Sequence, residues 1–388
     1  MIAYNREWLD NAALQEEAAY AYKEECISAE EKARIDEAYP SGFYTPNPFI
    51  RIGLFLLTTM IVLFSLALCC LIFMDGIKHA WRILLSFFGL AVYAALELFI
   101  KEKKHHRSGV DDGLLWMSAI LLLSVFNIDL DIPSWLRCAM VLLVAAYATL
   151  RFADMIMSVC ATLALLGTLF YLYLETGSIA RATVPFVLML ASLLIYQSAR
   201  RWSRIEKWRH YTDCFTTAEI SSLITLYLAG NYFVVREVSN EMFGLHLLPG
   251  QSIPAGWLFW ATTLIIPILY ILLGIRKKNL LLLRIGVVLS AASIYTIRHY
   301  YSVLSIEAAM TLSGLLLIAL AYALIRYLHT PKHGFTYHPV NRAHLFERLQ
   351  AESLIITETF ATPQTPARSS DFKFGGGSGG GGGADGSW

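Results

Sequence analysis

The sequence predicts an all-α, polytopic transmembrane helical bundle of about ten spans. Of its 388 residues, 56% are hydrophobic and only 16% are charged, whereas an ordinary soluble domain carries about 25% charged residues. The mean hydropathy is +0.52. The stretch 54–74 has no charged residue and is long enough to cross about 30 Å of hydrocarbon as a helix. The ten apolar stretches are residues 54–74, 80–100, 113–128, 134–152, 153–174, 182–199, 215–235, 255–275, 279–299 and 305–328.

Two boundaries between these stretches are weakly marked. The third and fourth stretches are separated by Asp129, Asp131 and Pro133, and the fourth runs into the fifth through Arg151 and Asp154. Ten is therefore the best count of spans, with nine and eleven as the alternatives.

The distribution of basic residues predicts the orientation of the bundle. With ten spans, the Lys- and Arg-rich loops 101–107, 200–209 and 276–278 fall on one side, together with both termini. Short loops rich in Lys and Arg stay in the cytoplasm, so we expect both termini there. The opposite loops, which carry few basic residues, are 127–134, 175–182 and 235–255.

An acidic segment, residues 1–48, precedes the first span and is expected to be a cytoplasmic helical module. Ser28 and Glu31 form a Ser-x-x-Glu capping box, in which each side chain satisfies a free amide at a helix start. Pro40 and the following Ser-Gly end that helix. A short helical hairpin is therefore predicted, with Trp8 as a candidate partner-binding residue. A stabilising cap on the bundle is the alternative role for this module.

The segment after the last span has two parts, a cytoplasmic linker at 329–370 and a flexible tail at 371–388. Apolar residues within 344–355 have the spacing of an amphipathic helix. The tail is rich in glycine, which gives a flexible coil. Phe374 and Trp388 flank that glycine run and are candidate partner-binding residues, although a plain disordered end fits the composition equally well.

Two short segments resemble known proteins. Residues 25–35, Glu-Cys-Ile-Ser-Ala-Glu-Glu-Lys-Ala-Arg-Ile, resemble the opening of a family of uncharacterised bacterial multi-pass membrane proteins, which show a Gly-Leu-Ile-Ser/Thr-x-Glu-Gln type of segment there. Residues 374–388 resemble the Gly-rich tails ending in Trp of bacterial membrane proteins with a TPM domain, but that domain is absent here. The resemblances imply a multi-pass protein of the bacterial cytoplasmic (inner) membrane.

Neither the cysteines nor the N-terminus indicates secretion. The six cysteines have no disulfide or zinc spacing and mostly lie inside predicted spans, which is typical of small apolar packing residues. The first apolar stretch begins only after about 48 residues of acidic sequence, so we expect no cleavable signal peptide.

Ionisable residues within spans are costly and therefore mark candidate sites. Glu219 and Arg284 enter their spans from the same side, so an interhelical ion pair between them is allowed. Arg151 and Asp154 are three residues apart and would pair on one face if the fourth and fifth spans join helically. Both pairs are more typical of structural than of functional charges.

On the predicted outer side, polar residues of three spans could form a vestibule. Small midspan hydroxyl residues, in contrast, usually hold helices together. The vestibule candidates are Asn231, Arg236, Arg298, His299 and Glu307.

No enzyme or cofactor motif stands out. His106 and Asp111 fit the His-x4-Asp pattern of lipid acyltransferases, in which the His is the base, but the rest of that catalytic domain is missing and a chance match is favoured. Four histidines within 329–344 are separated by prolines that break helical spacing, so no metal site is expected. We expect no cofactor, because no phosphate-binding loop precedes a helix, and no nucleic-acid partner, because the net charge is +1.

Two functions fit these observations. The favoured one is a non-enzymatic accessory or scaffold protein that contacts membrane lipids and binds partner proteins through its cytoplasmic segments. The alternative is a small-molecule transporter or channel that uses the outer vestibule. Interruptions at Pro185, Gly230 and Pro267 fall only in the second half, which argues against a transporter of two inverted repeats.

Overall fold

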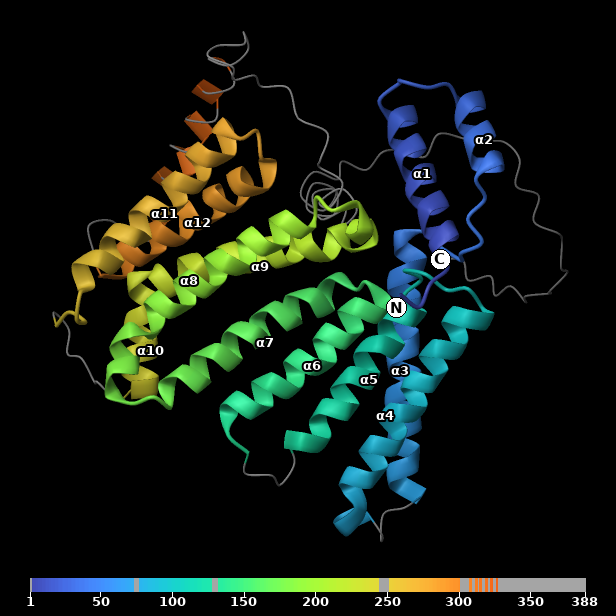
Figure 1. The fold of residues 1–388 in the computed structure, drawn as a ribbon, viewed down its shortest axis with the longest axis horizontal. Helices are drawn as coiled ribbons and strands as arrows, with labels where there is room; N and C mark the ends of the chain where they lie inside the picture. Colours follow the sequence, from blue (N-terminus) through green and yellow to red (C-terminus); the bar gives the residue numbers. More distant parts are fainter. Residues whose placement is uncertain are drawn as a thin grey trace, which may run out of the picture. The chain divides into compact units, whose positions relative to one another are not determined.

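The computed structural model describes residues 2–72, 77–127, 132–243 and 251–300, with isolated helical positions between 307 and 326. This part of the chain is all-helical (Figure 1) and contains twelve α-helices and a short 3₁₀ helix, η1. Seven of these helices are long and apolar enough to cross a membrane, as a multi-pass membrane protein requires. The helices are α1 Arg6–Lys23, α2 Ala29–Ala38, α3 Pro48–Ile72, α4 Ile77–Glu102, α5 Val110–Asn127, α6 Ser134–Phe152, α7 Met155–Leu174, α8 Ser178–Trp202, η1 Glu206–Tyr211, α9 Thr212–Gly230, α10 Tyr232–Phe243, α11 Gly256–Arg276 and α12 Leu280–Tyr300.

The predicted N-terminal hairpin is formed by α1 and α2. Ser28 and Glu31 make the expected capping box, with the Glu31 carboxylate accepting the Ser28 amide at 2.8 Å. At the other end of the hairpin, Gln15 of α1 donates to the Tyr39 carbonyl at 2.8 Å, just after α2. Local capping thus starts α2, and a side-chain to backbone bond fixes it against α1.

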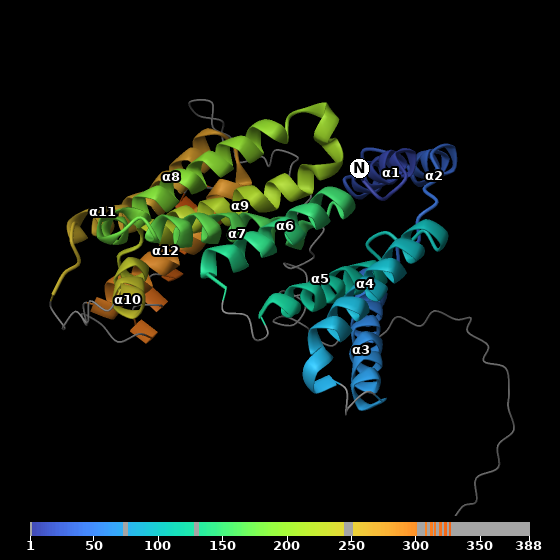
Figure 2. The same cartoon turned by 60° about the horizontal axis from the view of Figure 1, so that its bottom comes forward.

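Consecutive long helices pack as neighbours, because their connections are short. The pairs α4 with α5, α6 with α7, α8 with α9, and α11 with α12 make the most extensive contacts, and α6 and α7 lie side by side in both Figure 1 and Figure 2. The helix α9 also contacts α7, α10, α11 and α12. Its buried positions include the small hydroxyl residues Ser221 and Ser222, which allow close helix approach in apolar surroundings.

Two apolar cores result from this pairing. The first is built mainly by α4 to α7 and contains Leu96, which is 1% exposed. The second lies among α9, α11 and α12 and contains Tyr227, which is fully buried. The helix α3 contributes little to either core, because only 6% of its apolar window is buried.

Close packing of α3 on the start of α5 depends on one glycine. Gly109 has a φ of +90°, a conformation that L side chains rarely adopt. A Cβ atom at this position would also lie 2.1 Å from the Arg51 carbonyl of α3. Only glycine fits here, and its presence lets α3 approach the turn that precedes α5.

The fourth and fifth predicted spans do not join into one helix, which was the condition for pairing Arg151 with Asp154 on one face. Ala153 adopts a left-handed conformation, with φ at 52°, and ends α6. Asp154 then begins α7 as its N-cap, accepting the Met157 amide at 2.7 Å. The two spans are therefore separate helices, and Arg151 and Asp154 do not share a helical face.

The seventh predicted span, 215–235, is not one continuous helix. The chain breaks after Gly230, and the helix pair 206–230 and 232–243 is bent by 73° at Asn231. The expected interruptions at Pro185 and Pro267 behave differently, because both prolines lie inside continuous helices.

Candidate functional site

The N-terminal module is fastened to the ends of the spans that share its side of the bundle. The Ala3 amide donates to the Arg151 carbonyl at the end of α6, at 2.8 Å, and the Tyr44 amide donates to the Lys104 carbonyl at 3.0 Å. Asp10 pairs with Arg209 in η1. The module is therefore held by both α1 and the strand-like segment that follows α2.

Aromatic packing completes this attachment. The Tyr4 ring lies 4.6 Å from the His106 ring, and Phe43 lies 4.8 Å from the same imidazole. Trp8 packs edge-on against Phe43 at 5.4 Å, and the Lys104 ammonium sits 4.6 Å above the Trp8 ring. Trp8, a predicted partner-binding residue, is thus half-buried in a contact within its own chain.

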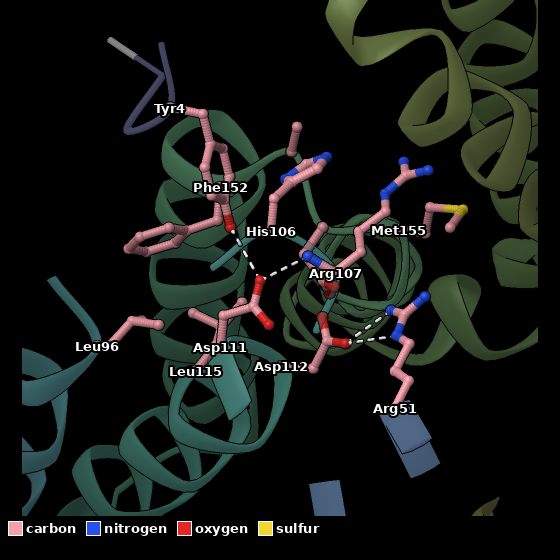
Figure 3. Close-up of a pocket in the computed structure, with 12 residues that line it drawn as sticks. Tyr4, Arg51, Leu96, His106, Arg107, Asp111, Asp112, Leu115, Phe152 and Met155 are labelled. Carbon is pink, nitrogen blue, oxygen red and sulfur yellow. Dashed lines mark hydrogen bonds and ion pairs between the residues drawn. The ribbon is translucent and has the colours of Figure 1, made fainter. Parts of the chain in front are cut away.

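Charged side chains gather beneath this module, at the start of α5 (Figure 3). Arg51 of α3 pairs with Asp112 of α5 at 2.6 Å. Arg107 pairs with Asp213 at the start of α9 at 2.7 Å. We call this group, together with Tyr4, His106, Asp111 and Asp154, the junction cluster. It joins α3, α5, α7 and α9 to the N-terminal arm.

Asp111, the acidic residue of the His-x4-Asp match, is hydrogen-bonded within a turn. Its carboxylate accepts the Arg107 amide at 2.7 Å and the Ser108 amide at 2.9 Å. Those bonds close the turn that leads into α5, as a capping aspartate does. A longer contact joins Asp111 to the Tyr4 hydroxyl at 3.5 Å. The pKa of Tyr4 is raised by burial and by the nearby Asp111. Asp111 therefore fixes a turn and receives the N-terminal arm.

The cavity at the junction cluster is small. Its volume is about 30 Å³, which is room for only a few water molecules. The charged groups around it form ion pairs with one another and with Asp213. Within the described ranges, no group of three or more His, Cys, Asp or Glu residues could hold a metal ion.

A second set of charges links α4 with α6. Glu97 accepts two hydrogen bonds from Arg151, each at 3.0 Å, and a third from the Tyr93 hydroxyl at 2.9 Å. Lys101, one turn along α4, adds an exposed contact to Glu97 at 3.3 Å. Arg151 thus reaches across to another helix, in place of the local pairing with Asp154 that the sequence suggests.

The break after Gly230 is lined by buried polar side chains. The side-chain oxygen of Asn231, Oδ1, accepts hydrogen bonds from the backbone amides of Phe233 and Val234 at 2.9 and 3.2 Å, which caps α10. Its amide group donates to the Tyr227 hydroxyl at 2.8 Å and to the Thr296 hydroxyl at 3.0 Å. The Gly230 carbonyl that the break leaves free accepts from Thr262 at 2.6 Å. These bonds satisfy the groups that an interrupted helix exposes in an apolar environment.

The predicted vestibule residues divide into two groups. Asn231 and Arg236 are brought together with the end of α12 but are buried, at 2% and 8% exposure. The Arg236 guanidinium lies 5.1 Å above the Tyr300 ring, and His299 packs 4.9 Å from Phe233. In the described part of the chain this region is therefore a packed aromatic cluster. The involvement of Arg298 and of Glu307, which is helical and exposed, stays a prediction.

The structure leaves the other predicted residues untested. Glu219 is 8% exposed in α9 and Arg284 is half-buried in α12, so their pairing stays a prediction. Phe374, Trp388, the linker at 329–370 and the histidines within 329–344 lie outside the described residues.

Sequence reasoning missed the ion pairs of Arg51 with Asp112 and of Arg107 with Asp213. A usable signal existed, since each of the four residues lies at a span end that the ten-span topology assigns to the same side. Which acid meets which base, however, depends on how the helices pack. No known protein family, curated protein or solved structure matches the chain.

Removal of the Glu97 carboxylate should destabilise the protein more than removal of its exposed partner. Glu97→Ala leaves Arg151 without its bidentate acceptor, and loss of charged hydrogen bonds in a partly buried setting costs about 2 kcal/mol. Lys101→Ala removes a side chain that is 65% exposed, so we expect a loss of at most about 0.5 kcal/mol. Unfolding of both variants in detergent checks this, and equal losses would contradict the assignment.

Asp154 should make stability fall as the pH rises. Burial raises its pKa, although the amides of Met157 and Ile156 partly lower it. A carboxyl group with a raised folded-state pKa binds its proton more readily when folded, so its contribution is largest at low pH. That contribution is lost as the pH rises from the ordinary aspartate value of about 3.9 through the raised value.

Two substitutions test this reading of Asp154. Asp154→Asn keeps the N-cap acceptor and should flatten the dependence of thermal stability on pH above 4. Asp154→Ala also removes the cap and should be about 1 kcal/mol less stable than Asp154→Asn at every pH. Melting curves from pH 4 to pH 8 provide the measurement, and an unchanged slope in Asp154→Asn would show that another group titrates.

The polar cluster at the break should depend on Asn231. Asn231→Ala removes the cap of α10 and two buried hydrogen bonds, which together contribute about 3 kcal/mol. Ser290→Ala in α12 removes only a local bond to the Gly286 carbonyl, so it serves as the control, with a loss below about 1 kcal/mol. The melting temperatures of Asn231→Ala and Ser290→Ala in detergent provide the measurement. Similar values for the two variants would argue against a structural role for the cluster.

Proposed function

We propose that the chain crosses the bacterial inner membrane about ten times with both termini in the cytoplasm. Seven helices are clear candidate spans. Three further spans, α5, the bent pair of α9 and α10, and the apolar stretch 305–328, bring the proposed total to ten. The end of the bundle that holds the N-terminal module also carries the basic turns after α4, α8 and α11. This excess of Lys and Arg at one end supports a cytoplasmic location for that end.

Reporter fusions test the orientation. A reporter that is active only outside the cytoplasm should be active after Ser178, between α7 and α8, and inactive after Ser203, between α8 and η1. A cytoplasmic reporter should show the opposite pattern. Equal activity at both positions would contradict the proposed topology.

We further propose that the protein is a non-enzymatic accessory or scaffold subunit that binds partner proteins. The N-terminal module supports this most directly, since its base is fixed to the spans while its tip stays open. No residue of α2 is buried. The turn between α1 and α2 borders an open groove of about 520 Å³, lined by Tyr22, Lys23, Glu25, Cys26, Ile27, Ser28 and Glu31.

The combination of a fixed base and an open tip suits the presentation of a binding surface. Ordering a mobile module on binding would cost conformational entropy, and attachment in advance avoids much of that cost. Tyr22, at the groove, is 47% exposed, and an exposed aromatic residue with a polar tip is a common interface anchor. The tail residues Phe374 and Trp388 are proposed as a second contact.

A photo-crosslinking amino acid placed at Tyr22 tests the groove. Crosslinking in cells should give a discrete adduct of full-length protein with one partner. Tyr39 offers a matched control, because it is 49% exposed but lies after α2, away from the groove. Adducts of equal yield at both positions, or none at Tyr22, would contradict the groove as the binding surface.

The alternative, a transporter or channel, is supported by the bent pair at Asn231. Interrupted helices whose free backbone groups meet polar side chains often mark substrate sites in transporters. Here these groups are satisfied within the chain by Asn231, Thr262 and Thr263, which favours a structural break. A transporter would be stabilised thermally by its substrate, whereas a scaffold would co-purify with a partner.

A further inference from the structure

The turn between α8 and α9 repeats basic and apolar residues with a period of three. The sequence from Arg201 to Arg209 reads Arg-Trp-Ser-Arg-Ile-Glu-Lys-Trp-Arg. Basic residues occupy positions 201, 204 and 207, and apolar residues occupy 202, 205 and 208. The third position of the repeat has no common residue type, since it holds Ser203, Glu206 and Arg209. Interleaved basic and aromatic residues of this kind are typical of segments at a membrane surface.

The basic residues of this turn differ in what they contact. Arg200 donates to the Tyr196 hydroxyl at 2.6 Å, and Arg209 pairs with Asp10 of the N-terminal module. In contrast, Arg201, Arg204 and Lys207 are exposed, and none makes an ion pair with the residues that the structure describes. Three positive charges are therefore available to an external anion.

The apolar residues of the turn are also exposed. Trp202 is 52% exposed and Ile205 is 43% exposed. The Trp202 ring packs edge-on against Phe215 of α9 at 6.2 Å, which holds the indole at the surface. A water-soluble anion would leave these apolar groups in water, whereas a lipid would cover them.

The turn between α8 and α9 connects two candidate spans, which places it at the membrane surface. Trp202 ends a candidate span that begins at Ile179, and the bent pair begins again at Glu206. A turn between two antiparallel spans lies at the depth of the lipid headgroups, where Trp is enriched and where anionic lipids attract Lys and Arg.

We propose that Arg201, Arg204 and Lys207, with Trp202 and Ile205, form a binding site for an anionic phospholipid of the inner leaflet. The three basic side chains contact the phosphate and headgroup, and the two apolar side chains lie against the acyl chains below it. This site depends on the proposed membrane topology but not on partner binding at the N-terminal groove. Failure of one can therefore be told from failure of the other.

The chain contains a matched control for this site. Arg276, Lys277 and Lys278 form a second exposed basic turn, between α11 and α12. It carries the same number of positive charges at the same end of the bundle, but no aromatic residue lies among them. General attraction between a basic surface and anionic lipid would treat the two turns alike.

Native mass spectrometry of the full-length protein in mild detergent provides the test. Phosphatidylglycerol and phosphatidylcholine are titrated separately, and the dissociation constant of the first bound lipid is measured. For Arg201→Gln/Arg204→Gln/Lys207→Gln we expect phosphatidylglycerol to bind at least about tenfold more weakly, since each basic residue contributes about fivefold to anionic-lipid binding. For Arg276→Gln/Lys277→Gln/Lys278→Gln we expect a change below about twofold.

Further variants separate loss of the site from loss of the fold. Arg201→Lys/Arg204→Lys retains the charge and should bind phosphatidylglycerol with a dissociation constant within about threefold of the wild type. Every variant should bind phosphatidylcholine within the same range of the wild type. Arg204→Gln alone, the mildest change, should weaken phosphatidylglycerol binding about fivefold. Equal losses in the two triple variants, no loss in the first, or equal competition by water-soluble glycerol phosphate would overturn the proposal.

Discussion

The need to neutralise charge at the ends of apolar helices governs this structure. Arg51, Glu97 and Arg151 lie in helices that are long and apolar enough to cross a membrane, where an unpaired charge is costly. Each of them meets a partner on another helix. The pairs are specific contacts between spans, because an acid in one helix reaches a base in another only when the helices adopt one arrangement.

The same charges explain how the N-terminal module is attached. In the turn before α5, the Arg107 side chain forms an ion pair with Asp213 of α9. The Arg107 and Ser108 amides of the same turn donate to the Asp111 carboxylate. The turn is thereby rigid, and it receives Tyr4 from the N-terminal arm. The module therefore depends on a turn that was already fixed by packing of the spans, and its own hairpin is stabilised separately by capping. This separation leaves the tip of the hairpin open for a partner.

The break between α9 and α10 follows a different rule, since neutral hydrogen bonds close it. Asn231 caps one helix and binds hydroxyl groups on two others, so the break in the chain is closed without any charge. Such a cluster of buried polar groups specifies one arrangement of α9, α11 and α12, because each donor must find its acceptor.

The sequence by itself determined the helical class, the long apolar helices and the capping box at Ser28, because each depends on local composition or spacing. Tertiary structure alone decided that Arg151 turns to Glu97, that Ala153 separates α6 from α7, and that the chain bends at Asn231. Those outcomes depend on which helices are neighbours. A pairing such as that of Arg51 with Asp112 joins residues 61 positions apart, and helical periodicity holds no information over that separation.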